Sequence, residues 1–129
     1  MNELYDTSVF IDYWNGDSAA VALVKSAINS PNTVSYSPIS VIELWQSAKL
    51  GRQEEIEFSA LTQHFIIDAG LSTNVAKKAG QSLMSYNRNQ RMRLTSDAII
   101  AATAEERGDK IRTRNIKDIR KFYSNVEVY

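Results

Sequence analysis

Short apolar runs alternate with longer amphipathic segments along the chain. The short runs predict strands at residues 3–6, 33–36, 110–113 and 126–129, and a further apolar piece lies at 65–67. Between them, the spacing of apolar positions predicts helices at 7–11, 18–30, 38–50, 53–64, 74–91, 98–107 and 116–122. Strands that alternate with helices in this way predict an α/β domain with a mainly parallel central sheet.

Polar residues before two of these helices indicate where the helices begin. Ser37 followed by Pro38 is a strong start, because serine caps free N–H groups and proline suits the first turn. The triplet Thr95-Ser96-Asp97 is expected to cap the most apolar helix, from 98 to 107. Asp97 is followed on its own face by Ile100 and Ala101, where a carboxylate is costly to bury without compensation. Two interpretations stay open, a capping acid and a site carboxylate.

Other acids lie where a parallel sheet would place a site. Asp6 ends the first predicted strand and residues 113–115 end a later one, and sites in such sheets form at the carboxyl ends of strands. Glu43 lies away from the apolar stripe that includes Leu44 and Trp45, so periodicity indicates a solvated glutamate. It is nevertheless the only acid in the apolar and small-polar stretch around it.

Composition narrows the class of protein. The 129 residues contain no repeat or linker-like segment, so we expect one domain at 1–129. The absence of cysteine excludes disulfides, thiolate metal sites and cysteine nucleophiles, and it fits a reducing cytoplasm. The chain does not open like a signal peptide, and no stretch approaches the ~20 apolar residues that cross a bilayer. We therefore expect a cytoplasmic protein without a membrane segment.

Net charge argues mildly against a dedicated nucleic-acid binder. Fifteen basic and fifteen acidic residues cancel, whereas proteins that hold nucleic acid electrostatically are usually basic. Two basic stretches stand out, Arg88 to Arg93 and Lys110 to Lys121, and a solvated face is the more common meaning of each.

The inventory of reactive side chains leaves carboxylates as the tools of any catalysis. The single His64 cannot form a zinc site of the usual kind without cysteine. No Ser-His-acid arrangement, phosphate loop or glycine-rich dinucleotide turn is present. Carboxylate-rich sites select hard ions such as Mg²⁺ or Mn²⁺.

Four blocks of the chain resemble a known family when they are taken together. They are YDTSVFID, SPISVIELWQSA, LTSDAIIAATAEERG and IRTRNIKDI, in family order and across nearly the whole chain. In this combination the chain resembles the PIN-domain ribonucleases, and most closely the VapC-type toxins of toxin–antitoxin systems. The resemblance implies a parallel sheet flanked by helices, with three or four acids that meet over the strand ends.

The same resemblance implies the site residues. Asp6 matches the first family acid, with Thr7 beside it as support, while Glu43 matches the second and Asp97 the third. The resemblance therefore favours a site role for Glu43 over a solvated one.

The fourth family position falls at Asn115 or at Asp118, and the wording of the last block favours Asp118. Thr113, Arg114 and Asn115 are then supporting or substrate-binding groups.

An activity and partners follow from the resemblance as expectations. Mg²⁺, with Mn²⁺ as a possible substitute, would be held by Asp6, Glu43 and Asp97 for hydrolysis of RNA phosphodiester bonds. The candidates for contact with the RNA backbone are Arg112, Arg114 and Lys117. The expected partners are an RNA substrate, a second copy of the chain and an antitoxin protein. The apolar residues offered for the antitoxin groove are Phe10, Tyr13, Trp14 and Val24.

Two alternatives compete with this interpretation. A phosphorelay receiver domain has the same size and layout but should show paired acids near the first strand, where this chain has only Asp6. A non-catalytic PIN-fold binding module would have no reason to keep Asp6, Glu43 and Asp97 together. Metal-dependent cleavage of RNA separates the three possibilities.

Overall fold

A five-stranded parallel sheet forms the centre of the molecule, in the order β3-β2-β1-β4-β5. The computed structural model describes residues 1–129. The strands are β1 (Glu3–Tyr5), β2 (Val34–Tyr36), β3 (Ile66–Asp68), β4 (Lys110–Arg112) and β5 (Val126–Glu127). In the central strand, Leu4 lies opposite Ser35 of β2 and Ile111 of β4. The predicted α/β class is confirmed, and the sheet is parallel throughout.

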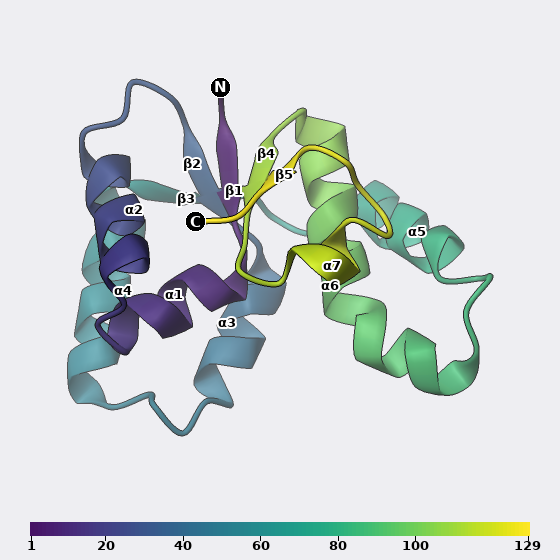
Figure 1. The fold of residues 1–129 in the computed structure, drawn as a ribbon, viewed down its shortest axis with the longest axis horizontal. Coiled ribbons are helices and arrows are strands. Elements are labelled where there is room, and N and C mark those ends of the chain that lie inside the picture. The colour runs from purple at the N-terminus through teal and green to yellow at the C-terminus, as the bar shows by residue number, and fades with distance from the viewer.

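Helices cover both faces of this sheet (Figure 1). They are α1 (Thr7–Trp14), α2 (Ser18–Ile28), α3 (Pro38–Trp45), α4 (Arg52–His64), α5 (Thr73–Ser82), α6 (Arg88–Arg107) and α7 (Ile116–Ile119). Successive side chains of a strand point to opposite faces. Tyr5 therefore packs in a core with α1 to α4, and Leu4 packs in a second core with α6 and α7. A third apolar cluster, which includes Ala79 and Leu94, joins α5 to α6.

None of the helices combines the length and the hydropathy that a membrane crossing requires.

The helix that carries Asp97 begins much earlier than the sequence pattern predicts. α5 ends at Ser82 and α6 runs from Arg88, so the predicted helices at 74–91 and 98–107 are both wrong in extent. A capping box starts α6: Asn87 Oδ1 accepts from the N–H of Gln90 at 2.9 Å, and Gln90 Oε1 accepts from the N–H of Asn87 at 3.0 Å. The apolar spacing does not reveal this reciprocal cap. Because of it, the helix begins at Arg88, at the start of the basic stretch from Arg88 to Arg93 and not after it.

The polar triplet at 95–97 lies inside α6 and caps nothing. The Thr95 hydroxyl donates to the carbonyl of Arg91 at 2.5 Å, one turn earlier in the same helix. Asp97 consequently stands in the middle of a helix whose N–H groups are already paired. The interpretation of Asp97 as a helix-capping acid is wrong, and the N-terminal end of a helix dipole does not stabilise its charge.

α3 begins where it was predicted to begin and ends sooner. Ser37 Oγ accepts from the N–H of Ile39 at 3.3 Å, and the helix ends at Trp45 instead of running to residue 50. Leu44 is fully buried, whereas Trp45 is 41% exposed. The predicted apolar stripe of this helix is therefore only partly buried.

Candidate active site

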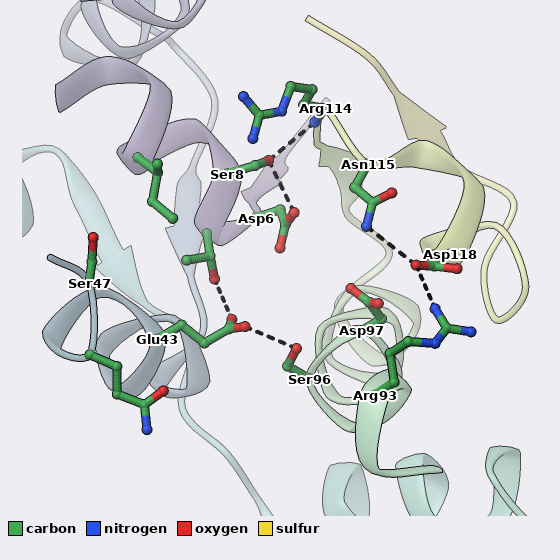
Figure 2. A pocket seen from close by; sticks show the side chains of 13 residues that line it. Asp6, Ser8, Glu43, Ser47, Arg93, Ser96, Asp97, Arg114, Asn115 and Asp118 are labelled. Atoms are coloured by element: carbon green, nitrogen blue, oxygen red, sulfur yellow. Dashed lines mark hydrogen bonds and ion pairs between the residues drawn. The ribbon is translucent and has the colours of Figure 1, made fainter. Parts of the chain in front are cut away.

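An open cleft of about 580 Å³ lies beyond the carboxyl ends of β1 and β4 and is lined by residues of α1, α3 and α6 (Figure 2). Only one of its thirteen lining residues is hydrophobic. We call it the acidic cleft after its four carboxylates, Asp6, Glu43, Asp97 and Asp118. The other lining residues are Thr7, Ser8, Ile11, Gln46, Ser47, Arg93, Ser96, Arg114 and Asn115. All four acids expected from the sequence therefore line the same cleft.

Asp6 is fixed between the first and fourth strands. Asp6 occupies the N-cap position of α1, but its side chain makes no capping hydrogen bond. The residue is only 7% exposed. The Thr113 hydroxyl donates to Asp6 Oδ2 at 2.7 Å, and the Ser8 hydroxyl donates to the same oxygen at 3.1 Å. The other carboxylate oxygen accepts no hydrogen bond from the protein. Thr113 thus has the supporting position that the sequence suggested, and Ser8 is a support that it did not reveal.

Glu43 is held from two sides by hydroxyl groups. Thr7 Oγ1 donates to Glu43 Oε1 at 2.6 Å, and Ser96 Oγ donates to Glu43 Oε2 at 3.2 Å. The glutamate is half-buried and links α1, α3 and α6. The solvated position that periodicity indicated is therefore wrong, because α3 turns this face toward the cleft and not toward bulk water.

Asp97 differs from the other acids because no group of the protein donates to it. Burial, followed by the charges of Asp6, Asp118 and Glu43, raises the pKa of Asp97 from 3.8 to about 7, against a weaker opposing effect of Arg93. A carboxylate without a partner among other carboxylates is a poor structural element and a ready ligand for a cation.

Asp118, at the rim of the cleft, forms ion pairs with two cationic side chains. Arg93 Nη1 and Lys121 Nζ each lie 3.1 Å from one of its oxygens, and Asn115 Nδ2 is 3.5 Å from the one that faces Arg93. The hydrogen bond from Lys121, and then that from Arg93, lower the pKa of Asp118. Asn115 and Asp118 line the cleft together, so both candidates for the fourth position are at the site.

The donor set fits a hard divalent cation that keeps part of its water shell. No group of three or more acidic or histidine side chains lies close enough to hold an ion by itself. Mg²⁺ commonly keeps several waters and takes only one or two protein carboxylates. Asp97, without a hydrogen-bond donor, and the free oxygen of Asp6 meet that requirement, and all nearby donors are oxygens.

The family of the chain follows from a match to a family model. The model of the PIN domain matches residues 4–123. The chain belongs to the PIN domain family. No curated protein matches it in sequence.

Solved structures of similar fold agree with this assignment. A toxin–antitoxin complex from Klebsiella pneumoniae is 27% identical with a TM-score of 0.68, and the match covers 97% of this chain and 95% of that one. VapBC2 from Rickettsia felis, bound to a DNA fragment from their promoter, is 19% identical with a TM-score of 0.68 over 100% and 99%. DNA-bound VapBC from Salmonella typhimurium is 18% identical with a TM-score of 0.65 over 100% and 97%. The expected PIN-domain family is confirmed, and the fold matches those of toxin–antitoxin structures, VapBC among them.

The cationic side chains around the cleft of this PIN domain differ from those expected. Arg114 lines the cleft, as expected, but Arg112 and Lys117 do not. The Arg112 guanidinium pairs with Glu3 at 2.9 Å on the sheet instead. Arg93 lines the cleft and was missed as a site residue. Its position four residues before Asp97 would have identified it, had the helix start been predicted correctly.

The expected apolar groove of the PIN domain is also smaller than the sequence suggested. Phe10 and Val24 are buried in the core beneath α1 and α2, so neither is available to a partner. Tyr13 and Trp14 remain, and they line a separate groove of about 330 Å³ together with Val21.

Proposed function

We propose that this PIN domain is a metal-dependent endoribonuclease and the toxin of a type II toxin–antitoxin pair. The observation that carries the proposal is the convergence of Asp6, Glu43 and Asp97 in one polar cleft, where Asp97 has no hydrogen-bond partner. A binding module without catalysis has no use for an unpaired, partly buried carboxylate among like charges. A receiver domain is excluded by membership of the PIN family.

The residues of the chain have separable roles in this proposal. When bound, Mg²⁺ or Mn²⁺ would activate a water for attack on the phosphodiester and stabilise charge on the phosphorus and the leaving oxygen. Asp6 and Asp97 would hold the ion, and Glu43 would act on it through a bound water, because no three acids lie close enough to ligate one ion together as the sequence suggested. Thr113 and Ser8 keep Asp6 in place, and the hydroxyls on Glu43 keep that side chain turned into the cleft.

Although the net charge of the chain is zero, one segment has a local excess of positive charge that could bind RNA. Residues 69–96, which include α5 and the start of α6, contain five basic residues and no acid. These are Lys77, Lys78, Arg88, Arg91 and Arg93, and all five are exposed. Only Arg93 is paired with an acid, and it lines the acidic cleft. A neutral chain can therefore still present a basic surface to phosphates, and Arg93 brings that surface to the acidic cleft.

The proposed partners are an antitoxin protein and a second copy of the chain, in the cytoplasm. Toxin–antitoxin and VapBC complexes are among the structures that the fold matches. The groove at Tyr13 and Trp14 is a suitable place for an apolar side chain of the antitoxin. On α3, the exposed side chains of Ile42 and Trp45 form an apolar surface that a dimer would cover.

Cleavage assays on the purified chain test the central proposal. We expect cleavage of a structured RNA with Mg²⁺ or Mn²⁺, none with excess EDTA, and loss of most activity in Asp6→Asn and Asp97→Asn. Glu43→Gln should lose nearly as much. Glu105→Gln, on the exposed far part of α6, is the matched control and should cut normally. Full cleavage in EDTA, or by Asp97→Asn with its fold intact, would contradict the proposal.

A further inference from the structure

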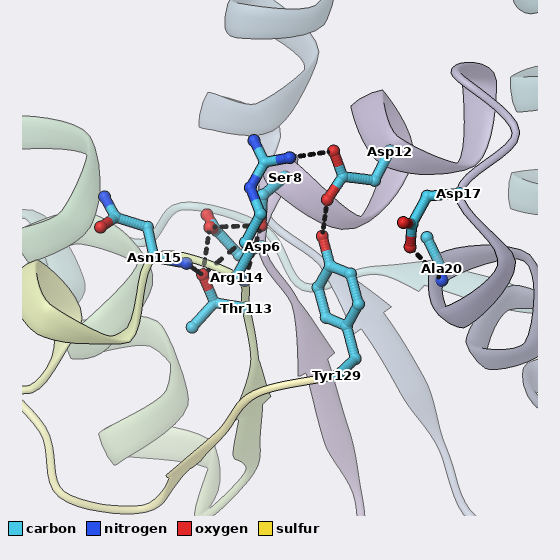
Figure 3. A network of polar contacts seen from close by, with 9 residues as sticks. All are labelled: Asp6, Ser8, Asp12, Asp17, Ala20, Thr113, Arg114, Asn115 and Tyr129. Atoms are coloured by element: carbon cyan, nitrogen blue, oxygen red, sulfur yellow. Dashed lines mark hydrogen bonds and ion pairs between the residues drawn. The ribbon is translucent and has the colours of Figure 1, made fainter.

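A buried carboxylate outside the acidic cleft connects the last residue of the chain to the cleft (Figure 3). Asp12, on α1, is only 4% exposed and both of its oxygens are engaged. Its Oδ1 accepts from Arg114 Nη1, and its Oδ2 accepts from the Tyr129 hydroxyl at 2.6 Å. Burial and the neighbouring Asp12 carboxylate raise the pKa of Tyr129, so this hydroxyl remains a donor throughout the physiological range.

Arg114 is held at two points, by its guanidinium and by its main chain. Its backbone N–H donates to Ser8 Oγ at 3.1 Å, and the same serine donates to Asp6 Oδ2 at 3.1 Å. The Arg114 side chain is nevertheless 63% exposed, and the residue lines the acidic cleft. Asp12 thus holds the guanidinium, Ser8 holds the main chain of Arg114 next to Asp6, and most of the Arg114 side chain stays open to solvent.

Stability alone does not account for this arrangement. A salt bridge with one well-exposed partner contributes little to folding, while burial of the other partner's charge carries a desolvation penalty. A guanidinium has five N–H donors in a fixed plane, and it recognises phosphate with two of them at once. Contact through Nη1 to Asp12 leaves other donors free. A buried anchor also removes rotational freedom that binding would otherwise have to remove.

We propose that Asp12 and Tyr129 are positioning residues, which fix the Arg114 guanidinium at the acidic cleft so that it binds a phosphate of the RNA. Asp12 orients the guanidinium, and Tyr129 orients Asp12. Neither residue touches the substrate. This inference rests on the proposed ribonuclease function and assigns one of its substrate contacts.

Steady-state kinetics test the assignment. The substrate is a structured RNA that the unaltered protein cuts, and Mg²⁺ is saturating. Arg114→Ala should raise KM about tenfold with kcat changed less than about twofold, as expected for loss of one charge-assisted contact. Asp12→Asn should raise KM by about fivefold and Tyr129→Phe by about twofold, again with little change in kcat. The double variant Asp12→Asn/Arg114→Ala should be no worse than Arg114→Ala, because residues that act through one another are not additive.

Asp109→Asn is the matched control for loss of a buried ion pair. Asp109 is as buried as Asp12 and pairs with Arg107 Nε at 2.8 Å, outside the acidic cleft. Melting curves should show that both aspartate variants are less stable, while KM rises only in Asp12→Asn. Should Asp12→Asn prove too unstable to assay, Tyr129→Phe and Arg114→Ala carry the same comparison.

The positioning role is overturned if Asp12→Asn and Tyr129→Phe leave KM unchanged, or if the effects of Asp12→Asn and Arg114→Ala on KM simply multiply. In either case the unaltered protein still cuts RNA, so the proposed function stands. If the unaltered protein cuts no RNA with Mg²⁺ or Mn²⁺, the proposed function fails and this assignment fails with it. The behaviour of the unaltered protein therefore distinguishes the two failures.

Discussion

Replacement of Asp97 by asparagine should stabilise the metal-free protein while it removes activity. Burial and the neighbouring acids raise the pKa of Asp97 to about 7, whereas an aspartate in the unfolded chain titrates near 3.9. Between these values the folded state binds more protons than the unfolded state. The free energy of unfolding therefore falls as pH rises from about 4 to about 7, and the loss is complete above that range. Asparagine removes both the charge and this dependence.

The size of the effect follows from the partial burial of this carboxylate. A shift of this size for a fully buried group would be worth about 4 kcal/mol at 1.36 kcal/mol per pH unit. Because Asp97 is only partly buried, solvent screens much of this, and we expect about 1–2 kcal/mol at pH 8. For a domain of this size that is roughly a 3–8 °C rise in Tm. Since Asp97 lies in the middle of α6, no helix terminus offsets the repulsion.

Melting curves in EDTA at pH 5, 6, 7 and 8 measure this directly. The parent should lose stability across the series relative to Asp97→Asn, so the difference between the two should be smallest at pH 5 and largest at pH 8. Mg²⁺ at ten times its Kd should stabilise the parent by about 1.4 kcal/mol and the variant by much less. Glu105→Gln, exposed on the same helix, should behave as the parent does. If Asp97→Asn melts below the parent at pH 8 in EDTA and both respond equally to Mg²⁺, the reasoning is refuted.

Three further predictions concern the support of the site, the RNA surface and assembly. Thr113→Val removes the 2.7 Å hydrogen bond to Asp6 and should reduce kcat by about tenfold, with a matching loss of Mg²⁺ affinity by calorimetry; unchanged values would contradict it. Lys78→Glu/Arg88→Glu should lower the slope of log Kd for RNA against log salt by roughly 1.5, whereas the control Lys25→Glu/Arg52→Glu should not. Sedimentation at tens of micromolar should show a dimer, and a monomer alone would count against it.

Much of this protein could be predicted from its sequence because the decisive signals are local. Apolar spacing over a few residues indicates strand or helix whatever surrounds it, so the α/β class follows from the pattern of the chain alone. Asp6 and residues 113–115 were placed at strand ends by their immediate neighbours, and both lie at the cleft. The four blocks identified the family because each block is a short run of adjacent residues.

The extent of the helices was harder to predict, because competing caps are decided by geometry. The Asn87–Gln90 capping box and the triplet at 95–97 are both plausible helix starts in the sequence. Packing of α5 on α6 through Ala79 and Leu94 favours the earlier start, and this decides that Asp97 is an unsupported mid-helix acid. Phe10 and Val24 were offered for a partner groove but lie in the core. The sequence alone does not distinguish apolar helix residues that face the sheet from those that face outward.

The order of residues specifies the set of elements and the acids that they carry, whereas the packing of those elements specifies which side chains meet. Glu43 is a solvated glutamate by periodicity and becomes a cleft residue only because Thr7 and Ser96 reach it from two other helices. Asp12 and Tyr129 are 117 positions apart, and no local pattern connects them. Contacts at such separation depend on how the strands align and how the helices pack on them, and these follow from the burial of the whole chain at once.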